Sequence, residues 1–372
     1  MVKKYFILLT MLVFTVFGFL LYHISWFIPN KFRNSPDVEY DIYGPMSDWI
    51  NISWFDFGLI RRALIGTILY PFSDEYKYIA FICMMCSALI IIIGGLYYLY
   101  KKSNYSSSAI LLLFSLSPLG AMQLGWCFGR FEYLNYSIII LFLLLKDRLN
   151  NFVISCLLSM GVLIHEAFIF YGWPIIAVLL IQTKCNKNNG WTNYLEIIGI
   201  FFMPICIALW LLFFGNLEAH AMGASRGIFE IPTCYFLTTN NLIPYISYLD
   251  IFSIYVVSIF YIITIFFFQR NIYKLNKQPL DLMFLAPFFC LFLYMLGVDY
   301  MRWTGIMFFL VCLTILYRYA NNEFHTPVTV NRSLLIQLVI LGFPFFGPIG
   351  IINPFPCLRN LLIMFNKIFG FF

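Results

Sequence analysis

Residues 78–100 have the sequence YIAFICMMCSALIIIIGGLYYLY, which contains no charged side chain and lies between Lys77 and the pair Lys101-Lys102. An α-helix rises ~1.5 Å per residue, so about 20 apolar residues are enough to cross the hydrocarbon core of a bilayer. The stretch therefore predicts a transmembrane helix. The fold class that follows is all-α, of the membrane-spanning kind.

The rest of the chain has the same character. Of its 372 residues 62% are hydrophobic and 11% are charged, whereas soluble domains carry about 25% charged residues. No segment between apolar stretches is long enough for a soluble domain, so we expect one integral membrane domain over residues 1–372. Together the apolar stretches predict a polytopic protein with about 11–12 transmembrane helices. The other stretches are 5–28, 107–123, 133–145, 152–164, 167–181, 194–214, 251–268, 282–296, 305–317, 334–351 and a final 357–372.

The distribution of Lys and Arg predicts the orientation. Basic residues gather in alternate short loops, beginning with Lys3 and Lys4, and such loops face the cytoplasm. The N-terminus is therefore expected inside, and most carboxylates lie in the opposite loops, two of which are long (about 30–77 and 215–250). The apolar stretch 5–27 is about twice the length found in signal peptides and no cleavage site follows it, so we expect it to be retained as the first helix.

The first long loop is expected to contain an interfacial helix. Residues 60, 64, 65, 68 and 69 are apolar at helical spacing, while Arg61 and Arg62 fall off that stripe. This pattern is typical of an amphipathic helix in the membrane interface, and Pro71 should end it.

Composition excludes several classes of function. The net charge of +6 is divided among short clusters between apolar stretches, which argues against a nucleic-acid partner. The sequence has no Walker, dinucleotide-binding or soluble-hydrolase motif. Cys83 and Cys86 form a C-x-x-C inside an apolar stretch without a nearby histidine, so no metal site is expected there. Cys127 and Cys234 are both expected outside the cytoplasm and can either pair or stay separate.

Four clusters of charged residues fall in the loops predicted to face away from the cytoplasm, where charge close to lipid often marks function. The first consists of Asp56, Arg61 and Arg62. Asp56 can act as a general base, and the two guanidinium groups match the oxygens of a diphosphate. The alternative is that the arginines only anchor the interfacial helix on phospholipid.

The second and third clusters lie in short turns between predicted helices. Arg130 and Glu132, in GRFEY at 129–133, are candidate contacts to phosphate and sugar, or simply charges that face water. His165 and Glu166 lie between two helices with almost no loop. Partial desolvation there is expected to raise the pKa of Glu166 towards neutrality, as a general acid or base requires. The alternative is that both side chains bond to neighbouring helix ends.

The fourth cluster is DYMRW at residues 299–303. Arg302 is a candidate phosphate contact, and Tyr300 or Trp303 a stacking surface for a sugar. Asp299 and Arg302 are spaced i, i+3, so a plain salt bridge is the alternative. Arg226, in the second long loop, is a further candidate substrate contact.

Residues 56–66 (DFGLIRRALIG), the His165-Glu166 turn and residues 299–303 together resemble multi-spanning proteins of bacterial surface-polysaccharide assembly. The chain looks like the Wzy-type O-antigen polymerases and, more broadly, the GT-C glycosyltransferases. The resemblance extends over the architecture of the whole chain, and its motifs are short.

The resemblance implies an enzyme of the bacterial inner membrane that acts on its periplasmic face, on oligosaccharides carried by undecaprenyl diphosphate. It implies a chain-length regulator and other polysaccharide-assembly proteins as partners. Asp56 matches by position the acidic residue that GT-C enzymes place in the first outside loop. No clear D-x-D pair is present, so transfer without metal or cofactor is expected, with arginines stabilising the leaving diphosphate.

Our hypothesis assigns the diphosphate to Arg61, Arg62, Arg130 or Arg302 and the proton acceptor to Glu166 or, as the second choice, Asp56. Two other functions stay open. One is a GT-C transferase that adds a single sugar from a polyprenyl-phosphate donor. The other is transport, as in a lipid-linked oligosaccharide flippase, which usually has related halves and charged residues along a central cavity.

Overall fold

A computed structural model describes residues 2–26, 50–185, 191–215, 248–296, 300–328 and 332–342. Within these ranges every regular element is a helix. Five helices are long and apolar enough to cross a membrane, which confirms a helical membrane protein. They contain the segments Tyr5–Tyr22, Tyr76–Lys102, Trp191–Phe213, Tyr255–Leu275 and Arg302–Ala320.

The chain divides into two compact units, each built from separate segments of the sequence. The first contains residues 1–40, 96–127 and 235–372, and the second contains 41–95 and 128–234. Helix α4 (Asp74–Lys102) belongs to the second unit up to Gly95 and to the first from Leu96.

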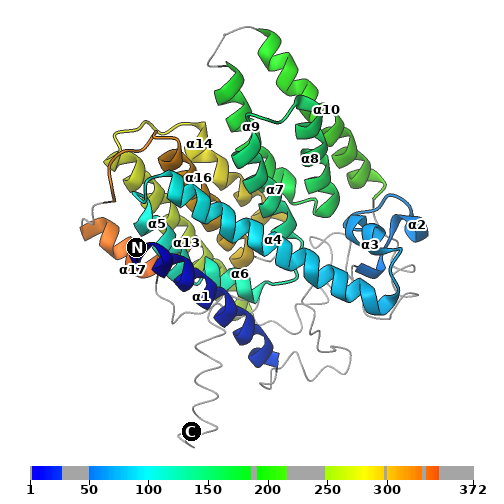
Figure 1. Cartoon of the computed structure of the whole chain (residues 1–372), viewed down its shortest axis with the longest axis horizontal. Helices are drawn as coiled ribbons and strands as arrows, with labels where there is room; N and C mark the ends of the chain where they lie inside the picture. The colour runs from blue at the N-terminus through cyan, green and yellow to red at the C-terminus, as the bar shows by residue number, and fades with distance from the viewer. Residues whose placement is uncertain are drawn as a thin grey trace, which may run out of the picture. The chain divides into compact units, whose positions relative to one another are not determined.

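In the first unit, α1 packs against α5 and α6, and α16 packs against α5, α13 and the 3-10 helix η2 (Figure 1). Helix α16 is buried on all sides, unlike the other four candidate spans. The elements are α1 (Val2–Trp26), α5 (Ser108–Leu116), α6 (Ala121–Trp126), α13 (Tyr248–Leu275), α14 (Leu282–Leu285), η2 (Ala286–Phe292), α15 (Leu293–Leu296), α16 (Tyr300–Ala320) and α17 (Arg332–Gly342).

Two glycines allow the close contact between α1 and α6. A Cβ added at Gly125 would lie 1.7 Å from the backbone oxygen of Thr15, and one added at Gly18 would lie 2.0 Å from that of Met122. Small residues let helix backbones approach in this way when packing, rather than the exclusion of water, drives association inside a membrane.

A buried arginine holds the ends of α13 and α16 together. Arg318 is 3% exposed, forms ion pairs with Asp281 and Glu323, and places its guanidinium carbon 4.8 Å from the ring centre of Tyr273 and 5.4 Å from that of Phe324. A buried cation is costly unless charged and aromatic groups surround it. Here they do, so the cluster fixes the turn that follows α16.

In the second unit, α7 packs against α8 and α9, and α10 packs against the same two helices (Figure 1). Asn150 caps α8 by accepting a hydrogen bond from the Val153 N–H (2.9 Å). The outer side of α10 exposes large apolar side chains, such as Leu195 and Phe202, as a lipid-facing helix does. The elements are α2 (Trp54–Phe57), α3 (Leu64–Leu69), α4, α7 (Glu132–Leu145), α8 (Asn151–Ile164), α9 (Phe168–Cys185) and α10 (Trp191–Phe213).

Two predicted helices are interrupted. The stretch 107–123 is divided into α5 and α6, because Ser117 before Pro118 has an extended backbone (φ −69°, ψ 136°), as the proline ring requires of the residue before it. The stretch 282–296 is helical throughout, but its middle, which contains Pro287, is a 3-10 helix.

The predicted interfacial helix is wrong in its extent. Helix α3 covers only Leu64–Leu69 and contacts α8, while Arg61 and Arg62 lie in the turn before it. It ends before Pro71, as predicted, but Ile68 is exposed, so the apolar residues do not form a single buried stripe. Most of the second long loop (216–247), with Arg226 and Cys234, lies outside the described residues.

Candidate functional site

The segment that carries the two arginines is seated by local hydrogen bonds and one close contact. The Trp54 N–H donates to Thr67 Oγ1 (2.8 Å), and the Trp54 indole donates to the Ile60 carbonyl (3.1 Å). A Cβ added at Gly66 would lie 1.9 Å from the Ile52 backbone oxygen, so only glycine lets α3 pack this closely. These contacts fix the turn at residues 61–62.

Arg61 connects this turn to the end of α10. Its Nε donates to the Leu211 carbonyl (3.1 Å) and its backbone N–H donates to the Gly215 carbonyl (3.0 Å). The last carbonyls of a helix lack partners within the helix, and a cation there is favourable. Arg61 therefore acts as a cap on α10.

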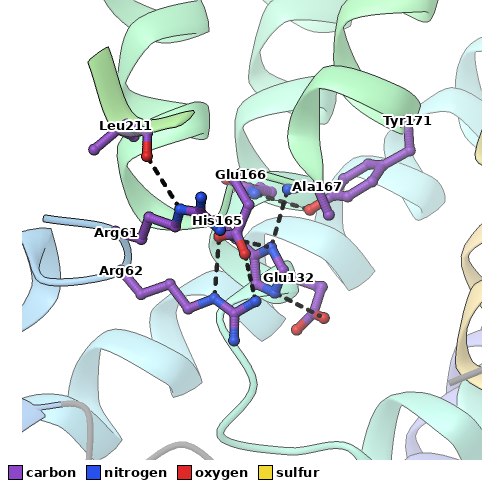
Figure 2. A network of polar contacts seen from close by, with 9 residues as sticks. Arg61, Arg62, Glu132, His165, Glu166, Ala167, Tyr171 and Leu211 are labelled. Atoms are coloured by element: carbon purple, nitrogen blue, oxygen red, sulfur yellow. Dashed lines mark hydrogen bonds and ion pairs between the residues drawn. The ribbon is translucent and has the colours of Figure 1, made fainter. Parts of the chain in front are cut away.

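Arg62 points the other way, towards the turn between α8 and α9 (Figure 2). Its Nε lies 3.0 Å from Glu166 Oε2 and its Nη2 lies 2.5 Å from Oε1, a bidentate pair between residues 104 positions apart. Arg62 adopts φ +59°, in the left-handed region that costs a side-chain-bearing residue ~1 kcal/mol or more. The ion pair and the cap made by its neighbour Arg61 hold the backbone in this conformation.

The turn that presents Glu166 is short and densely packed. Helix α8 ends at Ile164, and α9 begins at Phe168. The Phe168 ring is fully buried and fills the space that a Cβ would need at Gly161 on α8 and at Gly172 on α9. The Phe168 N–H also donates to the His165 carbonyl (3.0 Å). The buried Phe168 ring therefore fixes the conformation of the turn between α8 and α9.

His165 lies between the two carboxylates (Figure 2). Its Nδ1 accepts the Ala167 N–H (3.1 Å), and its Nε2 lies 3.6 Å from Oε1 of Glu132, the first residue of α7. Because Nδ1 accepts, neutral His165 must carry its proton on Nε2, directed at Glu132. Both side chains are at most 5% exposed, so the His165–Glu132 pair supports the turn from inside the protein and has almost no contact with solvent.

Burial and the Arg62 guanidinium lower the pKa of His165, against the opposing effect of Glu166 and Glu132. Burial alone would raise the pKa of Glu166, but the Arg62 guanidinium outweighs it and holds the pKa well below its ordinary value. The predicted rise in the pKa of Glu166 is therefore wrong. Desolvation is a local effect, whereas the opposing charge comes from a distant part of the sequence.

The accessible part of the site is the Arg62–Glu166 pair. Its side chains are 20% and 29% exposed, while His165 beneath them is 4% exposed. A solute can reach the guanidinium and the carboxylate, and it cannot reach the imidazole without rearrangement. His165 is thus a positioning residue, and Glu166 and Arg62 are the groups that can touch a substrate.

Three of the four predicted clusters contribute to this network. Arg62 comes from the first, Glu132 from the second, and His165 with Glu166 from the third. Arg130 lies near enough to lower the pKa of His165. Asp56 is exposed and accepts a hydrogen bond from Ser53 Oγ (2.6 Å), a contact within its own cap.

The fourth cluster belongs to the first unit. Tyr300 is the first residue of α16, and the Trp303 ring packs edge-on against Tyr294, 5.4 Å between centres. Arg302, one residue before, is half-buried. Asp299 and Arg226 lie outside the described residues.

Sequence reasoning missed the residues that support the site. Gly66, Thr67, Gly161 and Phe168 hold its backbone, and Asn135 on α7 donates to the buried Tyr171 hydroxyl (2.8 Å) next to it (Figure 2). Only Gly66 had a signal, as the last glycine of the 56–66 motif. The others look like ordinary residues of apolar helices.

Within the described ranges no group of three or more His, Cys, Asp and Glu side chains is arranged to hold a metal ion. Comparison with protein-family models, with curated proteins and with solved structures gives no match to this chain.

The buried imidazole of His165 should make the stability of the protein depend on pH. An unfolded histidine titrates near pH 6.5, and the folded pKa of His165 is lower, so protons bind the unfolded chain preferentially as the pH falls through 6.5. The contribution of the neutral His165 imidazole to the stability of the fold is complete above that pH, and it is lost as the pH falls below it. Glu166 acts in the same direction, but only below about its ordinary value of 4.5.

We therefore expect the melting temperature of the detergent-solubilised protein to fall more steeply between about pH 7.5 and pH 5.5 than that of a His165→Gln variant. Thermal melts of both proteins at the two pH values provide the measurement. Parallel pH profiles would contradict a buried neutral imidazole.

Proposed function

We propose that this protein is a membrane glycosyltransferase that joins polyprenyl-diphosphate-linked oligosaccharide units, as an O-antigen or similar surface-polysaccharide polymerase does. In this proposal the chain crosses a bacterial inner membrane about 11–12 times, with its N-terminus in the cytoplasm. The site built on Arg62 and Glu166 then faces the periplasm, in the compartment that holds the lipid-linked donor and acceptor.

The observation that carries the proposal is the bidentate pair of Arg62 and Glu166, partly open to solvent and supported from beneath by a buried His165–Glu132 pair. A guanidinium fork is suited to a diphosphate leaving group, and a carboxylate beside it is suited to an attacking hydroxyl. The segments that carry these groups belong to an apolar helical unit, where a lipid-borne substrate would lie.

The reaction transfers a glycosyl group. The hydroxyl oxygen of the acceptor sugar forms a bond to the anomeric carbon of the donor. The bond from that carbon to the lipid diphosphate breaks, and its electron pair leaves with the diphosphate. Glu166 accepts the hydroxyl proton, and Arg62 stabilises the charge that develops on the diphosphate. Asp56 is the second candidate for the proton acceptor, although its described contacts are confined to its own helix cap.

Purified protein incubated with lipid-linked repeat units tests the proposal directly. We expect products that are longer by whole repeat units, visible as a ladder on a gel. In cells, loss of the protein should reduce the ladder of surface polysaccharide to a single repeat. Polymerisation would be excluded if the purified protein formed no ladder and cells that lack the protein kept theirs.

The same measurements separate the rival functions. A transferase that decorates the chain with one sugar from a polyprenyl phosphate would leave the cellular ladder intact and change the mass of each repeat. If the protein is a flippase, its removal should leave lipid-linked units on the cytoplasmic side of the membrane. The purified protein should then not extend lipid-linked units.

A further inference from the structure

The Arg62–Glu166 pair raises a conflict for the proposed reaction. Arg62 uses its Nε and Nη2 on the two oxygens of Glu166, and this edge of the guanidinium can also bind two oxygens of a phosphate. One edge cannot hold both anions. As long as the pair is closed, this edge of Arg62 is withheld from a diphosphate and Glu166 is withheld from a hydroxyl proton.

The surroundings allow the pair to open. Both side chains are partly exposed, so an anion from solvent or from the membrane surface can approach Arg62 without unfolding the unit. Arg61 is kept on the carbonyl of Leu211, so the turn stays attached to α10 when Arg62 changes partner.

We propose that Glu166 is the resting occupant of the phosphate-binding fork of Arg62, and that an incoming phosphoanion displaces it and thereby frees it to accept a proton. The inference rests on the proposed function for the identity of the anion, a diphosphate. The exchange itself requires only a phosphate group that competes with a carboxylate for one guanidinium edge.

The exchange makes substrate binding the trigger for chemistry. Before binding, Arg62 keeps Glu166 ionised and a poor proton acceptor. After the exchange, the cation that lowered the pKa of Glu166 is neutralised by the phosphate, while burial still favours the protonated form. The carboxylate becomes a competent base only when a donor is bound, which protects the site from unproductive proton transfer.

Binding of inorganic diphosphate to the purified, detergent-solubilised full chain tests the exchange. Glu166→Gln removes the competing carboxylate and should lower the dissociation constant of diphosphate by about tenfold. The corresponding gain in binding free energy is within the range of a single charge-assisted hydrogen bond. Glu166→Asp, whose shorter side chain reaches the fork less well, should give an intermediate value. Arg62→Gln should abolish the binding. Isothermal titration calorimetry near pH 7.5 provides the measurement.

Glu196→Gln is the matched control. Glu196 also pairs with a cation, Lys184 at 2.6 Å, so this variant removes the same charge and the same type of ion pair elsewhere in the unit. It should bind diphosphate as the wild type does. Equal tightening in the Glu166 and Glu196 variants would mean a general electrostatic effect and would overturn the inference, as would unchanged or weaker binding in both Glu166 variants.

The result is separable from the proposed function. Tighter diphosphate binding in Glu166→Gln, together with no extension of lipid-linked units by the wild type, would support the exchange and reject polymerisation. Extension by the wild type, together with unchanged binding in the Glu166 variants, would support polymerisation and overturn the exchange.

Discussion

Reversing the charge of Arg62 alone, with Arg62→Glu, should abolish polymerisation and lower the melting temperature, whereas the double reversal with Glu166→Arg should restore the stability and not the activity. The single variant places a new carboxylate against Glu166, with Glu132 close behind His165. The double variant restores an ion pair between the same two positions. We expect a coupling free energy of about 1–3 kcal/mol from the double-mutant cycle.

Activity separates from stability in this experiment because the chemistry depends on which backbone carries which group. In the double variant the proton acceptor is on the turn before α3, and the guanidinium is on the turn after α8, each displaced from where the substrate needs it. Loss of a positioned base costs about 10²–10⁴ in rate. Chain extension by purified protein and thermal melts of the four proteins are the two measurements.

The Lys184–Glu196 pair provides the control for this cycle. It also joins two helices of the same unit, at 2.6 Å, with side chains 22% and 40% exposed. Reversal of both charges, with Lys184→Glu and Glu196→Lys, should leave chain extension unchanged. If the Arg62/Glu166 double variant is as active as this control, the two residues form only a structural salt bridge.

Arg318→Ala should lower the free energy of unfolding by about 1–3 kcal/mol, because the arginine is buried while its two carboxylate partners are partly exposed and stay solvated. The variant leaves Asp281 and Glu323 without their cation and removes a contact to the rings of Tyr273 and Phe324. The ends of α13 and α16 then lose one of the contacts that join them, while hydrogen bonds such as that of Asn276 to the Tyr319 hydroxyl remain. Chemical unfolding of the detergent-solubilised protein measures the loss.

Two comparisons make this prediction specific. Arg318→Lys keeps the charge but replaces the guanidinium near the Tyr273 and Phe324 rings by a compact ammonium, so it should recover only part of the stability. Lys102→Ala removes an exposed cation that bonds to Asn321 near the same end of α16, and it should cost at most about 0.5 kcal/mol. Equal losses for Arg318→Ala and Lys102→Ala would show that burial of the arginine contributes nothing.

Much of the helical architecture could be predicted, because apolar length is a local property. Each described apolar stretch is helical over most of its length, and the basic flanks of residues 78–100 mark the ends of α4 within a few residues. The break at Pro118 was also within reach, since the restriction on the residue before proline is local. It was missed because hydropathy averages over the break.

The site could be predicted only in part. Its charged residues stood out one cluster at a time, since each is unusual among apolar neighbours. The supporting residues carried no such signal: Phe168 is one of 43 phenylalanines, and its role depends on two glycines that sequence alone does not bring near it.

The sequence by itself determined that this protein is helical, that it belongs to a membrane, and which charged groups need a structural explanation. Those properties depend on hydrophobicity and helix length, which are summed along the chain. Only the tertiary structure decided that Arg62 meets Glu166 and that Arg61 does not, because a turn with positive φ sends neighbouring side chains to different helices. It also decided the sign of the pKa shift of Glu166, because the charge that sets it lies 104 residues away.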